Sequence, residues 1–140
     1  MNVEEDNKRV TLVKNAIHNP QDPRHFMRIK KVTKEVSASL KGKVAVKSSE
    51  TLKVMEVGFD IYDPVYYFPK SVFPANVLEK TSRTTHCPLK GDTTYYHLMT
   101  ENEKLEFVAW EYSESRPEAE VLKGYVALDG SVFEHTESNA

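Results

Sequence analysis

Residues 84–92 contain four side chains that could take part in catalysis or ligand binding. This segment brings together the imidazole of His86, the thiol of Cys87, the ammonium of Lys90 and the carboxylate of Asp92. A cation close to a thiol favours its reactive thiolate form, so the segment predicts a reactive or ligand-binding loop. Cysteine is also among the most buried residue types. The alternative is therefore a buried Cys87 beside a His86 that hydrogen-bonds the backbone.

Aromatic and acidic residues supply the rest of the candidate site. In a strand, Tyr66 and Phe68 share one face and Tyr67 lies on the other, so one face enters the core and the other can offer a hydroxyl to a ligand. Trp110 either anchors the core or lines a pocket, and Glu118 either forms a loop salt bridge or orients a substrate. The predicted ligand-binding residues are Tyr67, His86, Cys87, Lys90, Trp110 and Glu118, with His86, Cys87 and Lys90 as the catalytic candidates.

Several function classes lack support in the composition. The chain has 140 residues with 19 basic and 21 acidic side chains, which gives no electrostatic case for nucleic acid as the main partner. No apolar run approaches the ~18 residues of a membrane helix. Metal-ligand spacings and nucleotide-binding loops are missing, so we expect no metal and no cofactor. The single cysteine excludes an intrachain disulfide, and the charged start of the chain is unlike a secretory signal, so we expect a cytoplasmic protein.

Hydrophobic alternation with a period of two runs through most of the chain and predicts an all-β, mainly antiparallel fold. Lys41-Gly42-Lys43 is a compact turn between two alternating runs, which predicts a β-hairpin. Pro74 predicts one short helix over 75–79. The expected strands are 36–40, 44–46, 52–56, 65–68, 93–99, 105–109, 124–128 and 131–133.

The expected organisation is a single domain over residues 18–134. Residues 1–17 are interpreted as an N-terminal extension, partly disordered or a short helix, and residues 135–140 as a frayed tail. Residues 21–24 and 80–92 should be loops. Within the second loop we expect Gly91 to need a positive φ. We expect Lys90 to be exposed, either serving an anionic ligand group or pairing with Asp92 or Glu118, so that Lys90→Met would leave the melting temperature near its native value.

The motifs resemble a bacterial family known as domain of unknown function 427, over roughly residues 18–134. His25-Phe26-Met27-Arg28-Ile29 and residues 42–56 also look like this family, whereas Leu128-Asp129-Gly130 departs from its usual ending. The motifs that carry the resemblance are Tyr66-Tyr67-Phe68-Pro69, Thr85-His86-Cys87-Pro88-Leu89-Lys90-Gly91-Asp92, Tyr95-Tyr96, Ala109-Trp110-Glu111-Tyr112, Pro117-Glu118 and Gly124-Tyr125-Val126-Ala127.

The resemblance implies a β-tent-like fold, in which two antiparallel sheets meet at an angle with one or two short helices. Methionine-R-sulfoxide reductases and the thalidomide-binding domain of cereblon are of this kind. Such proteins often hold zinc on two C-x-x-C knuckles, which a chain with one cysteine cannot form. Hydrophobic packing must then hold the apex together.

Three functions remain open from the sequence. The first is binding of a small molecule, with an anionic group at Lys90, in an aromatic-lined pocket, with or without a reaction. The second is a non-enzymatic protein-interaction module, including a homodimer formed through a strand edge. The third is thiol redox chemistry at Cys87, which would need an external thiol because the chain has no second cysteine.

Overall fold

The computed structural model describes residues 15–138, which form two antiparallel sheets and two short 3-10 segments. The segments are η1 (Lys70–Val72) and η2 (Pro117–Leu122). In spatial order the long sheet contains β1 (Ile17–Asn19), β2 (Asp22–Lys31), β5 (Leu52–Val57), β6 (Val65–Pro69), β11 (Tyr125–Leu128), β10 (Lys104–Ser115), β9 (Gly91–Met99) and β7 (Leu78–Lys80), with β8 (His86–Cys87) also paired to β9. The small sheet contains β12 (Glu134–Ser138), β3 (Glu35–Leu40) and β4 (Lys43–Ser48). The predicted all-β fold of two antiparallel sheets is confirmed.

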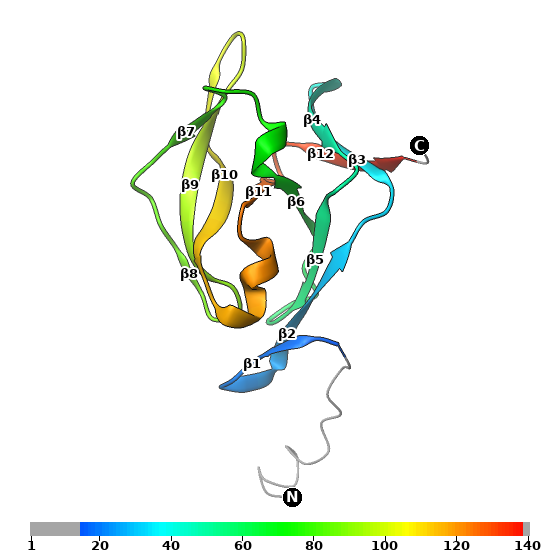
Figure 1. Cartoon of the computed structure of the whole chain (residues 1–140), viewed down its shortest axis with the longest axis vertical. Coiled ribbons are helices and arrows are strands. Elements are labelled where there is room, and N and C mark those ends of the chain that lie inside the picture. Colours follow the sequence, from blue (N-terminus) through cyan, green and yellow to red (C-terminus); the bar gives the residue numbers. More distant parts are fainter. Residues whose placement is uncertain (1–14, 139–140) are drawn as a thin grey trace, which may run out of the picture.

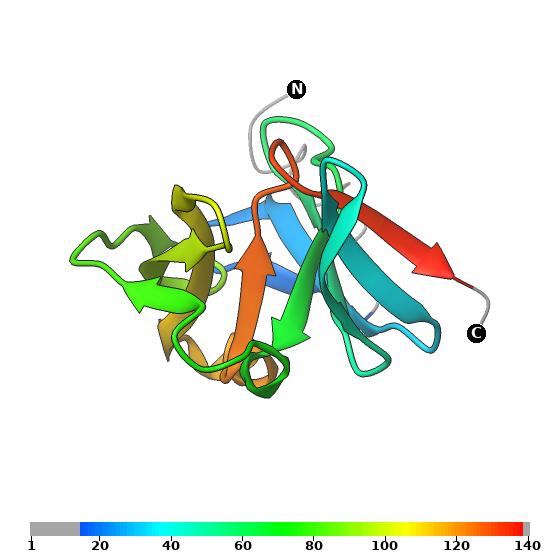
Figure 2. The same ribbon diagram turned by 90° about the horizontal axis from the view of Figure 1, so that it is seen from above.

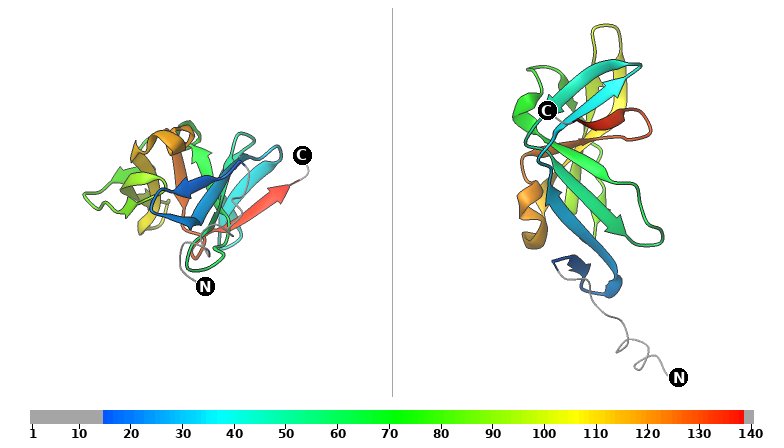
Figure 3. Two further views of the ribbon diagram at one scale, coloured as in Figure 1. Left: turned by 90° about the horizontal axis from the view of Figure 1, so that it is seen from below. Right: turned by 90° about the vertical axis from the view of Figure 1, so that its right-hand side faces the viewer.

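The long sheet curls. In Figure 1, β7, β9 and β10 stand on one side and β2 and β5 on the other, with β6 and β11 between them. Figure 2 shows the same curl from above, with the small sheet beyond β6. Figure 3 places β1 and β2 at one end of the molecule and the β3–β4 hairpin at the other. The lower ends of β5, β8 and β10 therefore come together with η2 above the β1–β2 turn (Figure 1).

Each face of the long sheet covers its own hydrophobic core. Alternation along β6 sends Phe68 into the core shared with the small sheet and Tyr67 into the other. The second core is closed by Ala119 and Leu122 of η2. Tyr66 packs on the side of Phe68, so the predicted division of these aromatics between two faces is confirmed.

Two local predictions are wrong. Residues after Pro74 form a single turn, in which the Val77 N–H donates to the Pro74 carbonyl (3.3 Å), and not a helix. Asn76 adopts a φ of 67°, which a right-handed helix cannot contain. The predicted loop at 21–24 instead opens the ten-residue strand β2. Only Met27 of this strand is fully buried, so its alternation is weak in the sequence.

The C-terminal region also differs from expectation. Residues 131–133 belong to a turn closed on the Asp129 carbonyl, and the last strand is β12, where a frayed tail was expected. β12 pairs with β3 along its whole length. The Glu137 carboxylate accepts hydrogen bonds from Lys53 Nζ (2.8 Å) and the Tyr66 hydroxyl (2.5 Å), which fastens β12 to the long sheet. Of the expected short N-terminal helix, Asn15 is in a turn with a φ of 60° and Ile17 lies in β1, so no helix forms over residues 15–17, and residues 1–14 and 139–140 lie outside the described residues.

We expect the docking of β12 to weaken in acid because of His135. Its ring stacks on Tyr66 and Phe68, and its buried Nε2 has no hydrogen-bond partner among the described residues. Burial lowers the pKa of His135 below its usual value of 6.5, so the unfolded chain binds the proton more readily and stability falls as the pH drops through that region. His135→Phe should raise the free energy of unfolding by about 1 kcal/mol and flatten its slope between about pH 7.5 and 5.5 in urea titrations. An unchanged slope would contradict this assignment.

Candidate functional site

A chain of polar side chains runs from the core of the protein to the β1–β2 turn. Lys90 is only 6% exposed, and its Nζ donates to Oε1 of Glu56 at 2.5 Å. The other oxygen of Glu56 lies 2.9 Å from Nε2 of His25. The expectation of an exposed Lys90 paired with Asp92 or Glu118 is therefore wrong, because its partner is a carboxylate on β5.

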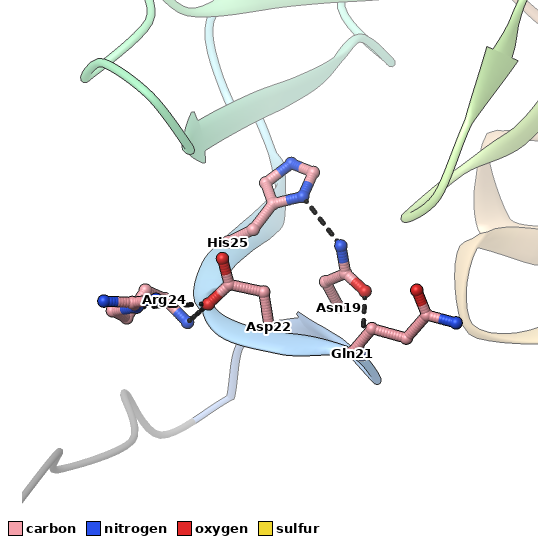
Figure 4. A network of polar contacts seen from close by, with 5 residues as sticks. All are labelled: Asn19, Gln21, Asp22, Arg24 and His25. Carbon is pink, nitrogen blue, oxygen red and sulfur yellow. Dashed lines mark hydrogen bonds and ion pairs between the residues drawn. The ribbon is translucent and has the colours of Figure 1, made fainter. Parts of the chain in front are cut away.

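The β1–β2 turn fixes the orientation of His25 (Figure 4). The Asn19 side-chain oxygen accepts the Gln21 backbone N–H (2.9 Å), which turns its amide nitrogen toward His25 Nδ1 at 3.2 Å. An N–H donated to Nδ1 leaves the His25 proton on Nε2, where it is donated to Glu56. On the outer side of the turn, Asp22 accepts both the backbone N–H and Nε of Arg24 (Figure 4). The turn therefore holds the His25 ring with Nε2 directed at the Glu56 carboxylate.

The ion pair stays charged at neutral pH. Burial raises the pKa of Glu56, but the charge and hydrogen bond of Lys90, together with the hydrogen bond of His25, outweigh burial and lower the Glu56 pKa below its usual value. Burial lowers the pKa of Lys90. Its neighbours Tyr67, Cys87 and Glu56 outweigh burial and raise the pKa above the usual value. Lys90 Nζ also lies 5.7 Å from the ring centroid of Tyr112. The lysine is thus held as a cation and is not poised as a neutral nucleophile.

Two adjoining hollows open beside this ion pair. The larger, about 750 Å³, lies between the β1–β2 turn, the β5–β6 loop and β8, and its wall includes His86 and Cys87. The smaller, about 320 Å³, is lined by Tyr67 and Lys90 among others. Glu56 and Tyr62 border both hollows. The structure therefore brings four of the six predicted ligand-binding residues together around Glu56.

The other two predicted residues are Trp110, which packs near Tyr67 without lining a hollow, and Glu118 on η2. Trp110 is half-buried, packs against the second core and lies 6.0 Å from Tyr95 between ring centroids. Glu118 is exposed on η2, and its carboxylate lies 3.2 Å from Nε of Arg116. Neither side chain lines the two hollows. Their contacts in the structure are core packing for Trp110 and a loop salt bridge for Glu118.

His86 and Cys87 stand on the wall of the larger hollow. His86 Nδ1 lies 2.6 Å from the Asp92 carboxylate across the β8–β9 pairing, with both side chains exposed. An exposed pair of this kind adds little stability, but it orients the ring and leaves Nε2 without a partner among residues 15–138, so that a ligand can reach it. Cys87 is half-buried. Within residues 15–138, no group of three or more His, Cys, Asp and Glu side chains could hold a metal ion.

Glu56 and His25 were not among the predicted site residues. Glu56 follows Leu52 and Val54 on the inward face of β5, and a carboxylate at an inward position needs a buried partner. The alternation of residues 52–56 could therefore have predicted that Glu56 is largely buried with a partner. His25 lies on β2, a strand that the sequence did not reveal, so its position beside Glu56 had no local signature.

Comparison with known proteins gives a family but no activity. The family model described as a domain of unknown function (DUF427) matches residues 28–139, which begins inside β2 and leaves His25 and Asn19 on its N-terminal side. No curated protein matches the chain. In the described part of the chain, no helix has the length and apolar character to cross a membrane. Because the match covers most of the sequence, and as its motifs indicated, the chain belongs to the DUF427 family.

Proposed function

We propose that the domain binds a small molecule in the two hollows that meet at Glu56 and Tyr62. The observation that carries the proposal is the Lys90–Glu56–His25 chain, which keeps an ion pair almost buried directly beside open space. Burying two charges costs more than packing apolar side chains in the same volume. Charged groups held in this way beside a concave, aromatic-lined surface are typical of ligand sites.

The residues divide by hollow. Tyr67 and Lys90 would contact the part of the ligand in the smaller hollow, and His86 and Cys87 the part in the larger one. An anionic ligand group at Lys90 would share the ammonium with Glu56 or replace it, since Glu56 already neutralises this charge. The proposal does not include Trp110 and Glu118.

A metabolite screen by thermal shift tests the proposal. A ligand at a hundred times its Kd should stabilise the fold by about 2.7 kcal/mol. His86→Ala should leave the unliganded melting temperature unchanged, because its ring is exposed, and should reduce the ligand-induced shift. Glu101→Ala, at an exposed residue outside both hollows, is the matched control and should keep the full shift. Hits that respond equally in all three proteins would place the ligand elsewhere.

Thiol redox chemistry at Cys87 is a second candidate, favoured by the position of this thiol on the wall of the larger hollow. The chain contains no other cysteine to resolve an oxidised form, so an external thiol must do so. The rate of alkylation by iodoacetamide, followed against pH, separates a reactive thiol from an ordinary one with a midpoint near ~8.5. An inaccessible thiol would rule out this chemistry.

A protein-interaction role is the third candidate, and uncovered apolar side chains support it. Val44 on the outer strand β4 and Phe59 and Ile61 on the β5–β6 loop are largely exposed. Size-exclusion chromatography over a range of concentrations tests the homodimer version of this role. A strict monomer at high concentration would remove it.

A further inference from the structure

The β5–β6 loop exposes two aromatic side chains to solvent at the edge of the larger hollow. Phe59 is fully exposed and Tyr62 is 43% exposed, and both line this hollow. Tyr62 also borders the smaller hollow. A large exposed apolar patch marks a surface that something else covers.

The exposure of these rings is built into the loop. The Gly58 N–H donates to the Asp60 carbonyl (2.9 Å), and the Tyr62 N–H donates to the Glu56 carbonyl (3.1 Å). A Cβ at Gly58 would lie 3.2 Å from Tyr62 Cε2 and 3.3 Å from His25 Cδ2, so the glycine lets both rings lie close to the loop backbone. The loop is therefore a closed turn that presents Phe59 at its tip.

The charged carboxylate of Glu56 and one nitrogen of His86, both in the wall of the larger hollow, already have partners. Glu56 is bound by Lys90 and His25, and His86 by Asp92. A ligand gains little from groups that it must first separate from such partners. Besides Nε2 of His86 and the thiol of Cys87, the uncovered faces of the aromatic rings are the main surface that a ligand can still contact.

We infer that the ligand carries a planar aromatic ring, which packs against Phe59 and Tyr62. This inference rests on the proposed small-molecule site and names the chemical class that the site takes. Aromatic pairs in offset or edge-to-face contact gain affinity beyond the area they bury. Tyrosine and phenylalanine have few rotatable bonds to immobilise, which makes them efficient contact residues. A hollow of about 750 Å³ is within the range that holds ligands of this size.

A protein partner is the competing occupant, and Ile61 separates the two. Ile61 is 80% exposed on the same loop but does not line the larger hollow. A protein that covers the loop would bury Ile61 together with Phe59. A ring bound in the hollow would contact Phe59 and leave Ile61 in water.

Matched probe pairs test the inference on the full chain. Benzoate and cyclohexanecarboxylate share a charge and a carbon count, as do benzylamine and cyclohexylmethylamine, so each pair isolates the effect of the planar ring. Binding is followed by amide chemical shifts in two-dimensional NMR. We expect the aromatic member of the bound pair to bind about three- to tenfold more tightly than its saturated counterpart. Phe59→Ala should abolish this preference, and Ile61→Ala should preserve it.

The outcomes test separately whether the ligand is aromatic and whether the hollows bind a small molecule at all. Binding at the hollows without preference for the ring, or a preference that survives Phe59→Ala, overturns the aromatic class and leaves small-molecule binding intact. If Ile61→Ala is as damaging as Phe59→Ala, the loop is covered as a whole, as a protein partner would cover it, and the inference fails. If none of the four probes at millimolar concentration perturbs residues around the hollows, the proposed site itself fails.

Discussion

Gly91→Val is expected to abolish folding of the domain. Gly91 has a φ of +115°, which a β-branched residue does not tolerate. A Cβ at this position would lie 2.1 Å from the Glu114 carbonyl oxygen and 2.9 Å from the Arg116 nitrogen, both backbone atoms at the end of the neighbouring strand β10. The backbone must move apart, at a cost of more than about 4 kcal/mol. Because small domains are stable by only about 5–15 kcal/mol, urea titration should show a protein that is largely unfolded or insoluble.

Gly42→Ala is the control for backbone strain without crowding. Gly42 has a φ of +79°, but a Cβ there would meet nothing within 4 Å. The cost should be the intrinsic penalty of the left-handed region, about 1–2 kcal/mol, and the variant should fold. Equal losses in the two variants would show that the close approach of the β8–β9 corner to β10 is unimportant.

Local sequence patterns were sufficient for elements whose signal is local. The alternation on either side of Lys41-Gly42-Lys43 predicted the β3–β4 hairpin, and both Lys41 and Gly42 adopt positive φ in its turn. Strand β12 carried no such signal, because its sequence is polar. It is held by pairing with β3 and by the hydrogen bond that Lys53 donates to Glu137, 84 residues away. No window of neighbouring residues contains that information.

For the same reason, only part of the candidate site could be predicted from the sequence. Residues 84–92 identified His86, Cys87 and Lys90 because they are close in the sequence. The exposure of Lys90 was predicted wrongly, because charged loop residues usually face water. Here the corner at Gly91, with its positive φ, turns the chain so that Lys90 points into the core. Its partner Glu56 lies 34 residues earlier, and only the folded sheet brings the two together.

Lys90→Met should therefore destabilise the domain strongly. Methionine keeps most of the apolar stem and removes the charge. Glu56 would remain in a largely buried position without its cation, and breaking a buried pair in this way costs about 3–5 kcal/mol. Lys53→Met is the matched control. The Lys53–Glu137 pair has side chains that are 24% and 27% exposed, compared with 8% and 19% for Lys90 and Glu56, so its loss should cost only about 1 kcal/mol.

The double variant Lys90→Met/Glu56→Gln isolates the interaction between the two charges. Removing the carboxylate charge as well should recover a large part of the stability lost in Lys90→Met, because no unpaired buried charge remains. The pH dependence gives an independent readout. Since the folded-state pKa of Glu56 is lowered from 4.5, the native ion pair contributes stability that is complete above about pH 4.5 and is lost as the pH falls through the folded pKa. The double variant should lack this acid-sensitive part in urea titrations at a series of pH values. Additive losses from the two single changes, with an unchanged pH profile, would mean that Lys90 and Glu56 act independently despite the contact between them.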